Sequence, residues 1–466
     1  MSTSRRWAIV LVVGLAVLAI PTPSGVTTQG WALFALFIAT IVGSIARPLP
    51  AGAVVFLGVA LAAVTGLLSP RDALSGYADP IVWLVLAACF LATALLKTGL
   101  GRRIAFHFIR RIGHSSLGLA YALAGTDVVL AGFVPSNSAR AGGIIFPIAQ
   151  SLAHAYESRP GPTARRLGAF LLLTLYQTDV IACATFLTGQ ASNVLIARFA
   201  HDTAHVDISY ARWLIGAIPP ALIALAVVPW LLFRWFPPEV RDTPQARAIA
   251  DDALAAMGPL QRAEQLTLVV FGSVALLWIT TAWHQLNPAT IALGGVAALL
   301  VTGVLRWEEL TGAQSAWDIF LWYGGVLRLA EAVAASGVMP RFAASVASVT
   351  TAWPWALALA LLVVVYCYAH YGFASITAHA TAMYIPFLAV LLTLGAPPLL
   401  SALLLAYTSN LGAALTHYGT TIGPIYFGAD YISQRDWWRM GLRVSMVTVA
   451  LWGTVGVLWW RILGWW

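Results

Sequence analysis

Two polar interruptions lie inside long apolar stretches of this chain, and they constrain its fold more than any other feature. The first is Val134-Pro135-Ser136-Asn137-Ser138-Ala139-Arg140, and the second is Ala374-Ser375-Ile376-Thr377-Ala378-His379. An arginine in the middle of a bilayer costs roughly 2.5–3.5 kcal/mol, so such a residue usually faces a cavity or a partner. Because Ser375 follows Ser136 by 239 positions (375 − 136), we interpret the interruptions as two copies of one element.

Further matches predict that most of the chain is an internal repeat. Pro386 follows Pro147 by 239 positions, and Trp322 follows Trp83 by the same 239. Upstream, Gly295-Val296-Ala297 follows Gly58-Val59-Ala60 by 237 (295 − 58). Several ordered matches with slowly drifting offsets are typical of two homologous structural units, and such repeats should be sought before other features.

The composition indicates an all-α polytopic membrane protein. The chain is 60% hydrophobic and only 9% charged, whereas soluble proteins are about 25% charged. The apolar runs predict about eleven transmembrane helices and two re-entrant hairpins. The lipid bilayer is therefore the first partner that we expect. The net charge of +8 does not predict a nucleic-acid partner, because the arginines cluster in loops between spans. Cys89, Cys183 and Cys367 lie in apolar segments without metal-ligand spacing, so we interpret them as packing residues.

The polar breaks and loops predict four parts. These are an N-terminal span over 1–28, a first repeat over 29–234, a cytoplasmic linker over 235–263 and a second repeat over 264–466. Each repeat is expected to hold one hairpin, at about 117–153 and 355–392, and one broken helix, at about 168–200 and 399–428. The second arm of the first hairpin is too short to cross a core about 30 Å thick. One kinked span followed by a loop is the alternative reading.

Basic residues predict the orientation. Arg5, Arg6 and the pairs Arg102-Arg103 and Arg110-Arg111 stand in segments that share one side if the N-terminus is cytoplasmic. The C-terminus is then outside. With five spans in each repeat, the second copy enters from the opposite side, so the repeat is inverted. We expect an integral protein of a bacterial inner (plasma) membrane.

The breaks carry groups that suit an anion. Helix N-termini at a break offer unpaired N–H donors, and hydroxyl and amide side chains add more. Ser136, Asn137 and Ser138 form one tip, and Ser375 and Thr377 form the other. Gly189 and Gly419 let the backbone turn at two further breaks.

Two basic residues follow the tips in register. Arg140 and His379 each stand four residues after a tip serine, one helical turn away. The alternative interpretations are structural: Arg140 would extend its charge to the membrane surface, and His379 would form a hydrogen bond within the helix packing. Asp127, Asp179 and Glu331 lie inside spans, and either pairing with another helix or a proton or cation role suits them.

These residues resemble a known family. Pro135–Ile145 with Pro147, and His370–His379, are similar to the two signatures of the divalent anion/sodium symporter family (DASS). Leu187–Asn193, Leu415–Gly419 and Tyr426-Phe427-Gly428 followed by Asp436-Trp437-Trp438 resemble its branch of plastid 2-oxoglutarate/malate translocators and bacterial citrate or tartrate:succinate exchangers. The resemblance covers nearly the whole chain.

The resemblance implies a homodimer with a scaffold domain and an elevator-type transport domain that carries the hairpins. Its substrates would be di- or tricarboxylates. The candidate substrate-binding residues, several of them carried over from the family, are Ser136, Asn137, Ser138, Arg140, Gly189, Asn193, Ser375, Thr377, His379, Thr416, His417, Gly419 and Thr420. Ile376 stands where the family's motif has asparagine, which puts sodium coordination in that half in doubt.

We therefore expect a secondary active transporter of malate, succinate or 2-oxoglutarate that exchanges anions, with Arg140 and His379 as fixed cations. The alternative is a sodium-coupled symporter, with Na⁺ as a coupling ion bound near Ser136, Asn137 and Gly189, and no other cofactor is expected. A channel or a structural membrane module is the rival from another class. An enzyme is not expected, because no nucleophile–base pair, metal set or cofactor motif is visible.

Overall fold

The fold of the first half is entirely helical. The computed structural model describes residues 2–338, 341 and 354–466, and no β-strand occurs in these ranges. The sequence also predicts a short segment around 340–348 before the second hairpin, and this segment lies outside the described ranges apart from residue 341. The first-half helices are α1 (Thr3–Ala19), α2 (Thr28–Ala46), α3 (Ala51–Val64), α4 (Pro70–Ser75), α5 (Pro80–Thr98), α6 (Leu100–Ile112), α7 (Ser116–Ala131), α8 (Phe146–Ala155), α9 (Gly168–Thr185), α10 (Ala191–Ala204) and α11 (Tyr210–Trp235).

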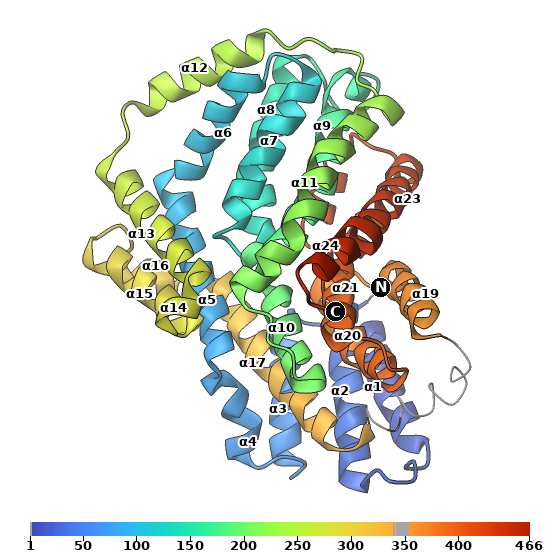
Figure 1. Cartoon of the computed structure of the whole chain (residues 1–466). Coiled ribbons are helices and arrows are strands. Elements are labelled where there is room, and N and C mark those ends of the chain that lie inside the picture. The colour runs from blue at the N-terminus through green and yellow to red at the C-terminus, as the bar shows by residue number, and fades with distance from the viewer. Residues whose placement is uncertain (1, 339–340, 342–353) are drawn as a thin grey trace.

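The second half begins after a linker helix (Figure 1). Its elements are α12 (Gln245–Met257) in the linker, then α13 (Arg262–Ile279), α14 (Thr281–His284), α15 (Pro288–Val301), α16 (Trp307–Thr311), α17 (Gln314–Ala335), α19 (Trp355–Tyr368), α20 (Ile376–Thr393), α21 (Pro398–Leu411), α22 (Gly423–Gly428), α23 (Gln434–Leu451) and α24 (Val457–Ile462). Short irregular helical turns, among them Ser138–Ile145 and Gly412–Leu415, join several of these helices.

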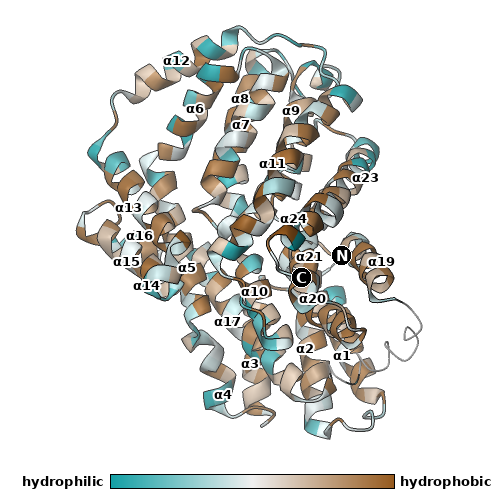
Figure 2. Cartoon of the chain, viewed as in Figure 1, coloured by the Kyte–Doolittle hydropathy of each residue, from teal (hydrophilic) through white to brown (hydrophobic). Residues whose placement is uncertain are grey.

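The helices are apolar enough for a membrane. Nine helical segments of the described chain are long and apolar enough to cross a bilayer. Figure 2 shows hydrophobic colour along most helices and hydrophilic colour on α12 and at several helix ends. The predicted count of about eleven spans differs from nine partly because α3 and α15 have only 14 residues each. At 1.5 Å per residue, 14 residues extend about 21 Å.

Matched helices of the two halves end in the same way. α3 and α15 have equal lengths and lie 237 positions apart, and Gly66 and Gly303 after them both have φ near +73°. Such a left-handed residue suits glycine, because glycine has no Cβ to clash. α3 packs on α17, and its counterpart α15 packs on α5. This reciprocal packing supports the predicted repeat.

The first pair of arms, α7 and α8, begins and ends on the same side of the molecule. At the start of α7, the Ser116 hydroxyl donates to the carbonyl of Val240 at 2.8 Å. Just after α8, the Tyr156 hydroxyl accepts from the amide of Ala246 at 2.9 Å. Because both outer ends bond to one short stretch of the linker, the chain between them enters the protein and returns.

The second pair of arms, α19 and α20, shows the same arrangement. Trp355 at the start of α19 lines an apolar cavity together with Leu400, which follows closely after α20. The Tyr384 hydroxyl of α20 donates to the carbonyl of Ala402 at 2.9 Å, so α20 lies along α21. Both arm pairs are thus arranged as hairpins, and their re-entrant position in a bilayer remains a prediction.

Candidate functional site

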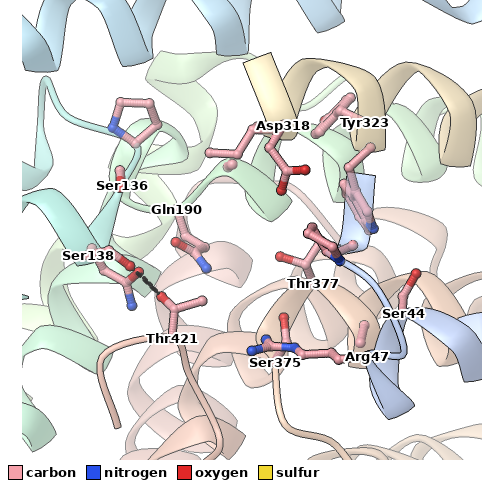
Figure 3. Close-up of a pocket in the computed structure, with 18 of the residues that line it drawn as sticks. Ser44, Arg47, Ser136, Ser138, Gln190, Asp318, Tyr323, Ser375, Thr377 and Thr421 are labelled. Atoms are coloured by element: carbon pink, nitrogen blue, oxygen red, sulfur yellow. Dashed lines mark hydrogen bonds between the residues drawn. The ribbon is translucent and has the colours of Figure 1, made fainter. Parts of the chain in front are cut away.

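The tips of the two hairpins line one cavity. Its volume is about 390 Å³, which falls within the range of small-molecule sites. Ser136, Asn137 and Ser138 reach it from the first tip, and Ser375 and Thr377 reach it from the second (Figure 3). Residues 239 positions apart in sequence therefore meet, as the paired interruptions predicted. The opposite wall comes from α17 and the connection between α2 and α3.

The first tip is held by a hydrogen-bonded network to the break after α21. The Asn137 amide donates to the Thr420 hydroxyl at 2.6 Å and accepts from the Thr421 hydroxyl at 2.9 Å. The hydroxyls of Ser138 and Thr421 lie 2.7 Å apart (Figure 3). Each bond joins residues more than 280 positions apart, so the network fastens one repeat to the other.

Arg140 lies behind the tip and does not line the cavity. Its side chain is fully buried, and its guanidinium lies 2.9 Å from carboxylate oxygens of both Asp127 and Asp179. It also donates to the carbonyls of Val134 and Gly189, at 2.8 Å each. The sequence left open whether the two acids pair with another helix, and in this structure both pair with Arg140. The predicted contact between Arg140 and substrate finds no support in this geometry.

The breaks after α9 and α21 each contain a tight turn of the same kind. A Cβ on Gly189 would lie 2.6 Å from the Cys183 carbonyl oxygen, and a Cβ on Gly419 would lie 2.6 Å from that of Ala413. Real side chains essentially never approach so closely, so only glycine fits at either place. The Gly189 carbonyl accepts from Arg140, and the Gly419 carbonyl pairs with His370 Nε2 at 2.8 Å. Each turn is therefore held by a basic side chain of the neighbouring hairpin.

His379 also lies behind its tip and outside the cavity lining. It is fully buried, and its Nε2 pairs with the Tyr366 carbonyl at 2.8 Å. Its ring stands 4.7 Å from that of His370, and the Nδ1 atoms of both histidines have no hydrogen-bond partner in the described chain. Like Arg140, His379 supports a tip in this structure.

The remaining candidates support the breaks. Asn193 donates to the carbonyls of Cys183 and Phe186 at 2.8 and 2.9 Å, and Asn410 donates to Asn193. Thr416 is fully buried, and its hydroxyl has no partner among the described residues. His417 accepts from the indole of Trp438 at 3.1 Å. The candidates Asn193, Thr416 and His417 do not line the cavity between the tips. Glu331, the third acid left open by the sequence, pairs with Arg198 at 3.2 Å.

Sequence reasoning missed several residues of the cavity wall. The polar ones are Ser44, Arg47, Gln190, Asp318, Tyr323 and Thr421. Gln190 and Thr421 lie within the breaks that had been recognised, so the same signal could have found them. Arg47 and Asp318 stand near helix ends, where a charged residue is ordinarily solvated, and no local pattern marks them.

Comparisons with known proteins agree with this architecture. Residues 2–466 match the family described as the sodium:sulfate symporter transmembrane region. The chain is 44% identical over 459 residues to the putative malate transporter YflS of Bacillus subtilis (strain 168), which covers 98% of this chain and 96% of that protein. It is 41% identical over 458 residues to dicarboxylate transporter 1, chloroplastic, of Arabidopsis thaliana, covering 97% and 82%.

A third relative and a solved structure extend the comparison. The L-tartrate/succinate antiporter of Shigella sonnei (strain Ss046) is 30% identical over 469 residues, covering 96% of each chain. The crystal structure of the Alcanivorax borkumensis YdaH transporter is similar in fold, with a TM-score of 0.58, 15% identity and coverage of 99% and 97%. The family and these relatives are transporters, so the chain is an integral membrane transporter and not an enzyme. With its whole length matched, the chain belongs to the sodium:sulfate symporter family, the DASS family whose signatures it resembles.

Proposed function

We propose that this protein is a secondary carrier for small dicarboxylates of the malate, succinate and 2-oxoglutarate type and that it exchanges one anion for another. Support for the substrate class comes from the named relatives, which include a malate transporter, a dicarboxylate transporter and a tartrate/succinate antiporter. It also comes from the cavity, where hydroxyls of both tips face one space large enough for such an anion. Tricarboxylates of similar size fall within the same proposal.

One observation favours exchange over sodium symport. Breaking a helix frees carbonyl oxygens, and free carbonyls are the groups that would coordinate a bound cation. Here the Gly189 carbonyl accepts from Arg140, and the Gly419 carbonyl pairs with His370. The carbonyls of Val134 and Tyr366, next to the tips, are taken by Arg140 and His379. Sodium near Ser136, Asn137 and Gly189 would compete with these donors.

The predicted role of Arg140 as a fixed cation that neutralises the substrate does not support exchange, because Asp127 and Asp179 already balance its charge. The proposal of exchange therefore rests on the occupied carbonyls at the breaks and beside the tips. The family's name includes sodium coupling, so sodium symport remains the competing function.

The arrangement of the carrier follows from the same proposal. The two hairpins and the two broken helices would form a transport domain that moves against a scaffold, as in an elevator, and two scaffolds would form a homodimer. The parts would be 1–28, 29–234, 235–263 and 264–466, with a cytoplasmic N-terminus and linker and an external C-terminus. The shared bonding of both outer ends of the first hairpin to the linker supports placing these segments on one side.

Counterflow in proteoliposomes tests the proposed function. Vesicles loaded with unlabelled succinate should accumulate labelled succinate or malate at the same rate in sodium and in choline buffers. Empty vesicles should accumulate almost none in either buffer. Uptake that required sodium, and that proceeded into empty vesicles, would establish symport in place of exchange. A flux that did not saturate and needed no internal anion would indicate a channel.

A further inference from the structure

One arginine lines the cavity from outside the two hairpins. Arg47 ends α2, and its side chain extends toward Ser375 in Figure 3. Both residues line the same cavity, together with Thr377 and Gln190. Arg47 therefore comes from a different part of the chain than the tips, and it lines with them the space proposed for the substrate.

The charge of Arg47 is not used by the protein. Three other arginines near the hairpins and α17 are bound to acids: Arg140 to Asp127 and Asp179, and both Arg198 and Arg328 to Glu331. No carboxylate lies within ion-pair distance of the Arg47 guanidinium in the described part of the chain. An unpaired cation in a cavity that also offers hydroxyl donors attracts an anion.

The backbone of Arg47 is held in an uncommon conformation. Its φ and ψ are 51° and 56°, in the left-handed region, which glycine and asparagine occupy more easily than arginine. Its N–H donates to the Gly43 carbonyl at 2.8 Å, and its own carbonyl accepts from Arg6 at 2.7 Å. Pro48 follows directly. The same left-handed conformation occurs at the C-caps His205 and Gln285, so it marks the end of α2 and fixes where the Arg47 side chain begins.

The acid on the same wall has a different neighbour. Asp318 of α17 lies directly against Gly52, in the first turn of α3. The N-terminus of a helix carries partial positive charge, which stabilises a carboxylate there. Among the described residues no ion pair joins Asp318 to Arg47, so the guanidinium remains available to a ligand.

We infer that Arg47 is a substrate-binding residue that recognises one carboxylate of a dicarboxylate whose other carboxylate is bound at the hairpin tips. The inference rests on the proposed function. It adds the residue that makes the site prefer dicarboxylates to monocarboxylates. A guanidinium can bind a carboxylate through two parallel hydrogen bonds, so it recognises shape as well as charge. A monocarboxylate of equal length would leave Arg47 unsatisfied.

The first test compares substitutions that keep the backbone. Arg47→Asn removes the charge with a side chain that tolerates the left-handed region. We expect it to raise KM for succinate counterflow by about tenfold or more, the size of effect of a lost charge-assisted bond. Competition by butyrate, which has one carboxylate, should change less than twofold. Arg71→Asn, which removes an exposed arginine of α4 outside the cavity, is the control and should leave KM unchanged.

The second test changes the sign of the charge at this position. Cys89, Cys183 and Cys367 are all buried, so Arg47→Cys introduces an accessible thiol. A 2-aminoethyl methanethiosulfonate adds an ammonium on a chain one atom longer than that of lysine and should restore part of the affinity, because it returns the charge without the planar fork. The 2-sulfonatoethyl reagent adds an anion and should weaken it further, and added succinate should slow both reactions. A residue that only supports the fold would not respond to the sign of the added charge.

The outcomes separate this inference from the proposed function. If the unmodified protein shows no dicarboxylate counterflow, the proposed function fails. If it shows counterflow but Arg47→Asn has the original KM, or both reagents act alike on Arg47→Cys, only the role of Arg47 fails. A parallel loss of succinate and butyrate affinity in Arg47→Asn would also overturn it, because selectivity for the second charge would then lie elsewhere.

Discussion

The two hairpin tips have the same sequence register but are held in different ways. The first tip is fastened by charge and by hydrogen bonds of its own polar residues, since Arg140 pairs with two acids and Asn137 bonds to Thr420 and Thr421. The second tip is supported from behind by the imidazoles of His370 and His379. In the described chain, the hydroxyls of Ser375 and Thr377 have no protein partner.

This difference indicates a division of labour between the repeats. Bonds to protein fix the position of a tip, and they also occupy groups that could otherwise bind substrate. The first tip therefore gives the site its shape, while the second presents hydroxyls that remain available to a carboxylate. Substitutions at equivalent positions should consequently act on stability in the first repeat and on affinity in the second. The predictions below test this contrast in order of decreasing effect on stability.

Arg140→Gln should have the largest effect. Removing the cation leaves the carboxyl groups of Asp127 and Asp179 buried without their partner, and breaking a buried ion pair in this way costs about 3–5 kcal/mol. We expect a strong fall in thermal unfolding temperature in detergent and loss of transport. Arg140→Lys should recover part of the stability, because it keeps the charge without the planar fork that reaches two acids. If Arg140→Gln were as stable as the original protein, the ion pairs of Arg140 would not be what holds the first tip.

Asn137→Ala should be the next in size. The substitution removes the bonds to Thr420 and Thr421, leaving polar groups of a buried network without partners, at about 1–3 kcal/mol. Transport should fall at least tenfold, mainly in its maximal rate, because the tip loses its fixed position. Unfolding temperature and counterflow kinetics together measure this. Were KM alone to change, Asn137 would act as a substrate ligand and not as a fastener.

His379→Leu should destabilise the second tip less. The substitution removes one hydrogen-bond donor that has no acid partner in the described chain and leaves the Tyr366 carbonyl without a partner, at about 1 kcal/mol for a typical hydrogen bond. His379→Gln, whose amide can still donate, is the matched variant and should lie closer to the original protein. The unfolding temperatures of both variants are compared with that of Arg140→Gln. The comparison tests whether the charged residue behind the first tip contributes more stability than the histidine behind the second tip. Equal losses at 140 and 379 would mean that the tips are held equally firmly.

The sequence predicted that the two tips meet, because polar residues in apolar stretches are informative, but it did not predict the difference in how they are held. Ser136–Ser138, Ser375 and Thr377 were predicted to meet, and all of them line the cavity. The partners of Arg140 could not be predicted, since the acid pairing depends on how α7 and α9 pack. For Asp127 and Asp179, sequence alone left pairing and transport roles equally open.

The position of Arg47 in the cavity wall could not be predicted from the sequence. An arginine at a helix end next to proline looks like any basic residue on the cytoplasmic side of a membrane protein. Its place in the cavity follows from the packing of the α2–α3 connection against the second hairpin, which joins residues more than 300 positions apart. Local patterns predict helices and breaks, whereas the opposite wall of a site depends on tertiary contacts.

Thr377→Val should sharpen the comparison most, because we expect it to leave stability unchanged. Valine replaces the hydroxyl with a methyl of similar size, and no bond to protein is lost in the described chain, so the unfolding free energy should stay within about 0.5 kcal/mol. If the hydroxyl donates to a substrate carboxylate, KM for succinate should rise several-fold with the maximal rate retained. Ser138→Ala, which loses the contact with Thr421, is the matched change in the first tip and should lower stability as well. Both substitutions remove one hydroxyl from equivalent positions of the tips, so a loss of stability in Ser138→Ala alone is the result expected if only the first tip is fastened through its hydroxyl to Thr421.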